Sequence, residues 1–222
     1  MKIKKLLRRY KHAWVLLYAF IYMPWFLWLE KTVTNDFYVI HSPLDDYIPF
    51  NEYFIVPYLL WFVFIAVTLG YFFFHDTQGF YKLALFLCSG MTIFLIISTV
   101  FPNGLDLRPD VFVRDNIFVD LVKQLYKSDT STNVLPSIHV FNSIGTYIAI
   151  SRSHELSRIK WVRYGSLALT ISIILATMFL KQHSIIDVVA AFAMGTLLYV
   201  LVYAKEPKTS CQPSRQPAFF KP

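Results

Sequence analysis

The stretch Phe179-Leu-Lys-Gln-His183-Ser-Ile-Ile-Asp187 connects two apolar runs, Tyr164–Leu180 and Ser184–Tyr203. Each run is close to the roughly 20 residues that cross a bilayer, so the pair predicts two antiparallel transmembrane helices joined by a short turn. An ionisable side chain at such a place is costly and indicates a functional site. His183 and Asp187 are four residues apart, so on a helix they share one face and the carboxylate can orient the imidazole.

The composition of the whole chain is that of a membrane protein. Its 222 residues are 56% hydrophobic and 18% aromatic, and the mean hydropathy of +0.48 is too high for an ordinary soluble domain. Runs near the length of a membrane crossing predict an all-α fold, a bundle of six transmembrane helices. The predicted spans are Ala13–Leu29, Phe54–Phe74, Leu83–Phe101, Ser137–Ser151, Tyr164–Leu180 and Ser184–Tyr203.

The fourth predicted span is the shortest and the most polar. It carries His139, Asn142, Ser143 and Thr146 within an otherwise apolar segment. Polar groups inside a bilayer need partners, so we expect this helix to face the interior of the bundle.

The charges predict an orientation in the membrane. The chain has 21 Lys and Arg against 14 Asp and Glu, a net charge of +7, and most of the basic residues fall in the loops and ends of one side. Basic loops stay in the cytoplasm, so both termini are predicted to be cytoplasmic and the protein to lie in the cell membrane. The predicted regions are a basic cytoplasmic N-terminus (1–12), a six-helix membrane domain (13–203) and a disordered cytoplasmic tail (204–222). This distribution disfavours nucleic acid as a partner.

The longest loop, residues 102–136, contains a second helical pattern. Its apolar residues recur at helical spacing, with charged residues opposite, which predicts a short amphipathic helix on the outer interface. The helix either covers the loop or shapes an entrance for lipid. The apolar positions are Ile117, Phe118, Leu121, Val122 and Leu125.

The predicted topology brings several polar residues to the outer face of the bundle. His183, oriented by Asp187, can attack phosphorus, and His139 can protonate the departing oxygen and later deprotonate water. Phosphate oxygens can be bound by Arg108, Lys181 and Ser137. No acidic cluster suited to Mg²⁺ is evident, so we predict neither a metal site nor a cofactor.

These residues resemble a known family. Pro136-Ser-Ile-His139 and His183-Ser-Ile-Ile-Asp187 are similar to the second and third motifs of the type 2 phosphatidic acid phosphatase (PAP2) superfamily, and Arg108-Pro109 looks like the end of its first motif. The resemblance implies a six-span fold and a metal-independent phosphohistidine mechanism on a lipid phosphate. His183 would be the nucleophile, Asp187 its orienting partner and His139 the general acid.

Two positions depart from the motifs of that family. Phe101 stands where the first motif begins with lysine, and Ala176-Thr177 stands where the third has a Ser-Arg pair, which leaves Lys181 as the nearest cation. Both losses weaken the phosphate clamp. They are reminiscent of the branch with inositol-phosphorylceramide and sphingomyelin synthases, which transfer a phosphoryl headgroup between lipids.

Three alternatives to a lipid phosphatase stay open at this point. The first is such a lipid phosphotransferase. The second is a small transporter that uses the His–Asp pair as a proton relay, although the chain lacks the inverted repeats of many transporters. The third is a membrane metallohydrolase, for which a third strong ligand is missing.

Overall fold

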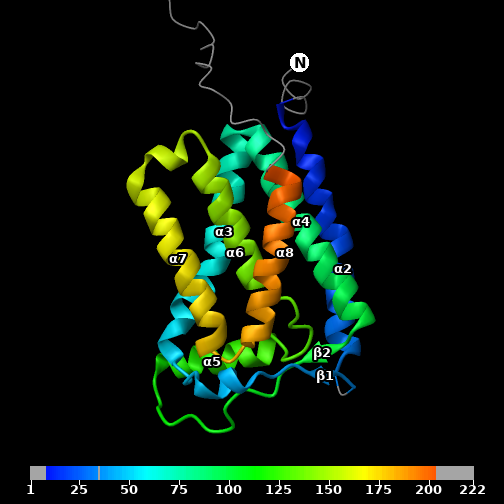
Figure 1. Cartoon of the computed structure of the whole chain (residues 1–222), viewed down its shortest axis with the longest axis vertical. Helices are drawn as coiled ribbons and strands as arrows, with labels where there is room; N and C mark the ends of the chain where they lie inside the picture. The colour runs from blue at the N-terminus through cyan, green and yellow to red at the C-terminus, as the bar shows by residue number, and fades with distance from the viewer. Residues whose placement is uncertain (1–8, 35, 204–222) are drawn as a thin grey trace, which may run out of the picture.

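Six long helical segments run side by side and form a bundle (Figure 1). The computed structural model describes residues 9–34 and 36–203; the predicted cytoplasmic tail and most of the predicted N-terminal region lie outside these residues. The segments are η1 (Lys11–Tyr18) continued by α2 (Ala19–Thr32), α3 (Ile55–His75), α4 (Thr77–Val100), α6 (Ile138–Arg152), α7 (Lys160–Phe179) and α8 (Ile185–Tyr203).

Five helical segments of the described chain are long and apolar enough to cross a membrane, which is typical of a multi-pass membrane protein. They are Lys11–Thr32, Glu52–His75, Thr77–Val100, Lys160–Phe179 and Ile185–Tyr203. Each predicted span contains a helix, but α6 has only 15 residues. At 1.5 Å per residue it covers about 22 Å, less than the roughly 30 Å of a hydrocarbon core. The prediction of six spans is therefore confirmed for five.

The short helix α6 occupies the centre of the bundle. It contacts α3, α4, α7 and α8, and its polar residues His139, Asn142, Ser143 and Thr146 are all buried. The hydroxyls of Ser143 and Thr146 donate to the carbonyls of His139 and Asn142 one turn earlier in the same helix. The prediction that this helix faces the interior is confirmed, and the two hydroxyls are tolerated because the backbone of the helix accepts their hydrogen bonds.

Two glycines allow α4 and α6 to approach closely. A Cβ at Gly90 of α4 would lie 2.1 Å from the ring of Phe141, and one at Gly145 of α6 would lie 2.5 Å from the ring of Phe86. The two rings stack at 4.6 Å with an interplanar angle of 1°. This contact fixes α6 against α4 and thereby the depth of His139, which lies near the start of α6.

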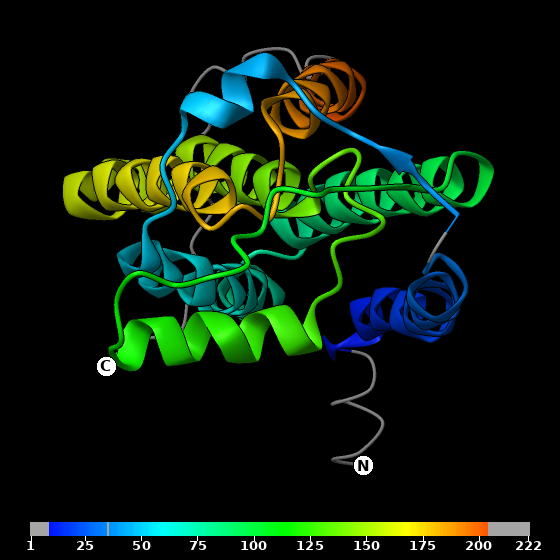
Figure 2. The same ribbon diagram turned by 90° about the horizontal axis from the view of Figure 1, so that it is seen from below.

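The amphipathic helix predicted in the long loop is present as α5 (Ile117–Ser128). It lies across the end of the bundle (Figure 2), with Val119 and Val122 buried. The side chain of Asn116 caps it by accepting from the backbone N–H groups of Phe118 and Val119. The helix is confirmed, and its position on a membrane surface stays a prediction.

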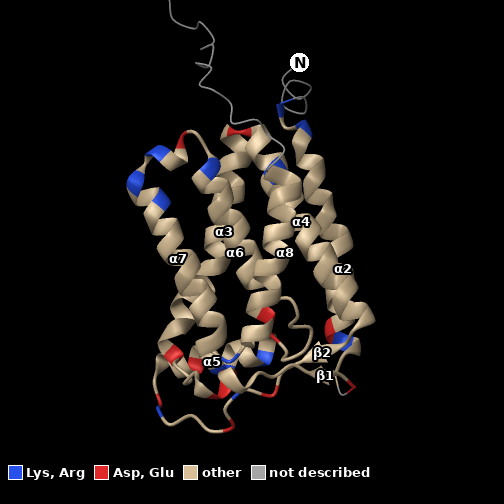
Figure 3. Ribbon diagram, viewed as in Figure 1, with Lys and Arg blue, Asp and Glu red and all other residues tan. Residues whose placement is uncertain are grey.

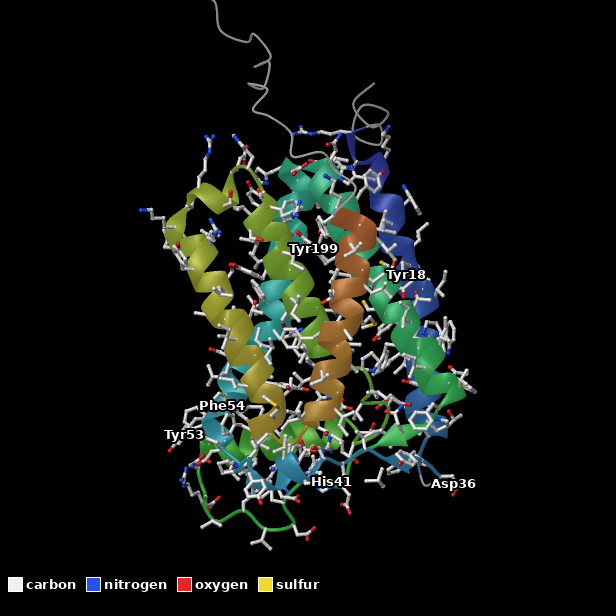
Figure 4. The ribbon with its side chains drawn as sticks, viewed as in Figure 1. Tyr18, Asp36, His41, Tyr53, Phe54 and Tyr199 are labelled. Carbon is white, nitrogen blue, oxygen red and sulfur yellow. The ribbon has the colours of Figure 1, made fainter. Side chains whose placement is uncertain are left out.

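The loop between α2 and α3 crosses the same end of the bundle, as the positions of Asp36, His41 and Tyr53 in Figure 4 show. It contains β1 (Tyr38–Val39), which pairs in parallel with β2 (Asn103–Gly104), and the short helices η2 (Pro43–Tyr47) and η3 (Glu52–Phe54). A further short helix, η4 (Leu156–Arg158), precedes α7 at the other end.

Charge divides the two ends of the bundle. Most Asp and Glu lie at the end that carries α5, whereas Lys and Arg lie at both ends, so the end where α7 begins is the basic one (Figure 3). Helix η1 begins, and the described part of α8 ends, at this basic end (Figure 1). The asymmetry agrees with the charge pattern read from the sequence.

Candidate active site

The turn between α7 and α8 holds His183. The backbone N–H groups of Gln182 and His183 both donate to the carbonyl of Thr177, at 2.9 and 3.0 Å, and Lys181 adopts a left-handed conformation with φ 53°. Helix α8 begins at Ile185, so His183 precedes the helix. This agrees with the predicted span Ser184–Tyr203, which leaves His183 in the turn, so the pair joins the turn to the first turn of α8.

The predicted His–Asp pair forms. His183 Nδ1 lies 3.4 Å from Asp187 Oδ2, and the same oxygen accepts from the backbone N–H of Ser184 at 2.9 Å. Asp187 is completely buried and its other carboxylate oxygen has no hydrogen-bond partner among the described residues. With Nδ1 facing the carboxylate, Nε2 is left as the reactive nitrogen.

Asp45 fixes this turn from a distant part of the sequence. Its carboxylate accepts from the Ser184 hydroxyl at 2.6 Å and from the backbone N–H of Ile185 at 2.8 Å, so it caps α8. It also accepts from the backbone N–H of Ser42 in the capping box of η2. Asp45 is buried, and no spacing in the sequence connects it with residue 184.

His139 lies in the first turn of α6, opposite His183. The side chain of Ser137 caps α6 by accepting from the backbone N–H of Val140, and the backbone N–H of Ser137 donates to the carbonyl of Asp187. The rings of His139 and His183 have centroids 5.7 Å apart. The fold thus brings together the three residues predicted to be catalytic.

Aromatic rings from α3 pack against His139. The ring centroids of Trp61 and Tyr58 lie 4.3 and 4.7 Å from that of His139. His139 Nδ1 is buried and has no hydrogen-bond partner among the described residues. The orientation of this histidine therefore depends on ring packing.

The guanidinium of Arg108 is bound to the protein and contacts Gln182, the residue before His183. It donates to the carbonyls of Tyr126, Asp129 and Thr130, and to the side-chain oxygen of Gln182 at 2.7 Å. The guanidinium also lies over the ring of Tyr126, 4.4 Å from its centroid. Burial lowers the Arg108 pKa, and Asp129 acts in the opposite direction. Phosphate binding by Arg108 stays a prediction.

Lys181 and Ser137, the other predicted phosphate ligands, are also engaged within the protein. Lys181 Nζ donates to the carbonyl of Asp45 at 2.8 Å, and burial lowers the Lys181 pKa while Asp45 and Asp46 raise it. Neither Lys181 nor Ser137 is among the residues that line the neighbouring cavity. Their contacts with phosphate also stay predictions.

A cavity of about 670 Å³ contains both histidines. Its walls come from α2, α3, α4, α5, the start of α6 and the two loops that carry Asn133 and Gln182. Most of the wall is apolar or aromatic. Among the described residues that line it, none is Lys or Arg, and Glu30 and Asp129 are carboxylates.

The two carboxylates were missed by the sequence analysis. Glu30 ends a membrane helix, where acids are ordinarily interfacial, and Asp129 lies in a polar loop, so neither position carries a signal. Burial raises the Asp129 pKa, as does Glu30, whereas a hydrogen bond from Tyr58 and the charges of His183 and Arg108 lower it. Within residues 9–34 and 36–203, no three His, Cys, Asp or Glu side chains are grouped so that they could hold a metal ion.

The sequence model of the PAP2 superfamily matches residues 83–210, which is more than half of the chain. The chain belongs to the PAP2 superfamily. Members of this superfamily are phosphatases or related phosphotransferases. No curated protein and no solved structure matches the chain.

Proposed function

We propose that this protein is a membrane lipid phosphatase that hydrolyses a lipid phosphate or diphosphate through a phosphohistidine on His183. The observation that carries the proposal is the His183–Asp187 pair with the ring of His139 5.7 Å away, both histidines lining one cavity. A nucleophile, its orienting carboxylate and a second acid–base group are the parts that covalent phosphoryl transfer needs.

The reaction proceeds in two displacements. His183 Nε2 attacks phosphorus, the bond from phosphorus to the leaving oxygen breaks, and His139 gives that oxygen its proton. Then His139 takes a proton from water, the water oxygen attacks phosphorus, and the bond to His183 Nε2 breaks. Asp187 accepts the Nδ1 proton in a hydrogen bond and stabilises the positive charge on the imidazole.

The apolar walls of the cavity fit the tails of a lipid. Met23 of α2 and Leu59 and Phe62 of α3 line the cavity and are also exposed on the outer surface of the bundle. Leu121 and Leu125 of α5 continue the apolar wall. A lipid in the bilayer can therefore place its chains between these helices while its phosphate reaches the histidines, which makes α5 part of the entrance.

One observation favours a second function, a lipid phosphotransferase. The described lining has no Lys or Arg, and a phosphodiester carries less charge than a phosphomonoester and needs a weaker clamp. In that case a lipid alcohol, in place of water, takes the phosphoryl group from His183.

A product assay on purified protein separates the two functions. We expect release of inorganic phosphate from a lipid phosphate in EDTA and without any lipid acceptor. Turnover that starts only when diacylglycerol or ceramide is added, with the headgroup moved and no free phosphate, would establish the transferase. Activity lost in EDTA and restored by a divalent metal would contradict the phosphohistidine mechanism.

We also propose that both termini are cytoplasmic and that the cavity opens at the extracytoplasmic face of the cell membrane. The separation of basic and acidic ends supports this orientation (Figure 3). After Cys88 and Cys211 are replaced by serine, Ser128→Cys should react with an impermeant maleimide in intact cells, and Glu155→Cys should be protected. The reverse pattern would invert the topology.

A further inference from the structure

One wall of the cavity is built from hydrogen-bond acceptors. Glu30 accepts from the Thr130 hydroxyl at 2.6 Å and from the Asn133 side-chain amide at 3.0 Å. Asp129 accepts from the Tyr58 hydroxyl at 3.0 Å. We call Glu30, Asp129 and Asn133 the acid wall; all three line the cavity with His183.

The acid wall has no free cation to balance it among the described lining residues. Arg108 is a cation that contacts the backbone of the acid wall. One of its guanidinium nitrogens already donates to the carbonyls of Asp129 and Thr130 and to the side-chain oxygen of Gln182. A phosphomonoester that carries only negative charge would therefore meet two carboxylates in a cavity lined mostly by apolar and aromatic side chains, which is unfavourable.

Two residues that line the cavity each carry a buried polar atom without a hydrogen-bond partner among the described residues. Asn133 Oδ1 is an acceptor without a partner, and Gln182 Nε2 is a donor without a partner. The exposed fractions of these side chains are 5% and 3%, so each unmade hydrogen bond is costly unless a ligand makes it. The acceptor belongs to the acid wall, whereas the donor is adjacent to His183 in the chain.

Aromatic side chains complete the surroundings of the acid wall. Tyr22 and Phe26 of α2 and Trp61 of α3 line the same cavity, and the rings of Tyr22 and Phe26 stack at 5.7 Å. Carboxylates, a free carbonyl oxygen and aromatic faces are the groups that bind an ammonium ion in proteins.

We propose that the cavity takes a lipid phosphate that carries an ammonium group close to its phosphate, with phosphorus at His183 and the ammonium at the acid wall. The inference rests on the proposed phosphoryl transfer by His183 and specifies its substrate class. Two kinds of lipid present this chemistry, a phosphodiester with an amine in its headgroup and a phosphomonoester of a long-chain amino alcohol.

The chemistry of each kind follows from the same displacement. With the phosphodiester, the lipid alcohol leaves with a proton from His139, and the amine-bearing phosphoryl group stays on His183 until water or an alcohol takes it. With the monoester, the amino alcohol leaves and inorganic phosphate is the product of water attack. The identity of the released product therefore distinguishes the two sources.

The test compares substrates that differ at the nitrogen. Purified protein is given phosphatidylethanolamine, its N-acetyl derivative, which is uncharged at nitrogen, and its N-trimethyl derivative, which is larger and still cationic. A parallel set uses a long-chain amino alcohol phosphate and its N-acetyl derivative. In at least one set, we expect kcat/KM for the amine to exceed that for the N-acetyl compound by about 10- to 100-fold, the range of a charge-assisted hydrogen bond. An equal loss with the acetyl and trimethyl compounds would show a size effect and overturn the inference.

Charge-neutralising variants assign the preference to the acid wall. Glu30→Gln and Asp129→Asn should each reduce the ratio of amine to N-acetyl kcat/KM by about tenfold, because each removes one charge and keeps a side-chain acceptor oxygen. Asp120→Asn is the matched control. It removes an exposed carboxylate on α5 that pairs with Lys123 outside the cavity, and the ratio should not change.

Binding separates this inference from the proposed activity. His183→Ala protein is equilibrated with radiolabelled phosphatidylethanolamine or its N-acetyl derivative, and with the amino alcohol phosphate pair. Tighter binding of the amine, reduced by Glu30→Gln, supports the acid wall even if no substrate is turned over. Equal binding within both pairs overturns the inference, even if the wild-type protein hydrolyses phosphatidic acid. A third outcome also overturns the inference. If turnover of phosphatidic acid requires Mg²⁺ in the wild type and no longer requires it in Glu30→Gln, the acid wall binds a metal ion that accompanies the phosphate and not an ammonium group.

Discussion

The two sides of the cavity are assembled in different ways. The histidine side has His139 near the start of α6 and His183 with Asp187 at the turn before α8, so its parts lie in two short segments that were recognisable in the sequence. The acid wall joins Glu30 at the end of α2 to a loop that lies 100 residues later, through the hydrogen bond from Thr130. The comparison indicates that the proposed catalytic residues come from short local motifs, whereas the proposed selectivity for the headgroup depends on contacts between distant segments.

The largest expected effect is on the histidine side. His183→Ala should abolish turnover of every substrate, because the proposed covalent intermediate forms on His183, the imidazole that the buried Asp187 orients. Asp187→Asn should leave a small residual activity, since the imidazole remains but loses the carboxylate 3.4 Å from its Nδ1. Single-turnover assays with ³²P-labelled lipid measure both values.

The labelled protein itself provides the control for this prediction. Acid-labile, base-stable ³²P should be trapped on the wild-type chain and be absent from His183→Ala. If His183→Ala retains the trapped label, the nucleophile lies elsewhere and the assignment of the histidine side fails.

His139→Ala should have the next largest effect. General acid–base catalysis typically accelerates a reaction by about 10²- to 10⁴-fold, so kcat should decrease by a factor in that range. A substrate with a good leaving group, such as a p-nitrophenyl ester, needs no proton on its leaving oxygen. The rate of the first displacement with this substrate should therefore fall much less in His139→Ala. An equal loss with both leaving groups would mean that His139 serves only to hold the aromatic packing around Trp61.

Much of the fold could be predicted because apolar length is a local property. Each predicted span contains a helix, and α5 follows the periodicity of Ile117 to Leu125. The fourth span was only partly right, since α6 is a short helix surrounded by the others, and a hydropathy window does not distinguish burial in protein from exposure to lipid. The turn at His183 was predicted, since the span Ser184–Tyr203 begins one residue before α8, but the cap that Asp45 provides for α8 was not, because it lies elsewhere in the sequence.

The residues of the candidate site that lie in short local motifs could be predicted from the sequence, and those that depend on long-range contacts could not. His139, His183 and Asp187 were recognised from their spacing, and the structure brings them together. Arg108 was recognised too, but its bonds to three loop carbonyls and Gln182 depend on how the loop of residues 102–136 folds back. Glu30, Asp129 and Asp45 act through long-range contacts, and one sequence carries no signal for such contacts.

A smaller effect is expected from pH on the acid wall. Burial raises the Asp129 pKa above its ordinary value of 3.8, and Glu30 raises it further, whereas Tyr58, His183 and Arg108 lower it. Asp129 therefore becomes neutral at a higher pH than an ordinary aspartate, and the preference for the amine over its N-acetyl form should fall as the pH drops through this raised pKa. The ratio of the two kcat/KM values is the measurement, because titration of the histidines affects both substrates alike.

Asp129→Asn gives the control for the pH profile. The asparagine cannot titrate. In this variant the ratio of amine to N-acetyl kcat/KM should be lower than in the wild type, and its pH profile should lack the step that the titration of Asp129 causes. The same raised pKa means that Asp129 favours the folded state most at low pH and that this contribution is lost as the pH rises through the folded-state pKa. Asp129→Asn should therefore be relatively more stable than the wild type at neutral pH; an unchanged step in the variant would assign the titration to another group.

The smallest expected effect concerns the support of the histidine side by Asp45. This carboxylate caps α8 through Ser184 and Ile185, next to the nucleophile. Asp45→Ala should lower the free energy of unfolding by about 0.5–2 kcal/mol, as for the loss of other helix caps, and should reduce kcat because His183 is less well oriented. Asp46→Ala is the matched control, since Asp46 is an exposed neighbour that forms an ion pair with the side chain of His41 and makes none of the contacts of Asp45 with Ser184 and Ile185; its effect should stay within about 0.5 kcal/mol. Thermal unfolding in detergent together with kcat for the amine and N-acetyl substrates measures both variants.

Because Asp45 contacts the turn and not the acid wall, kcat should fall equally for the two substrates; a change in their ratio would show that the two sides of the cavity are coupled through this loop.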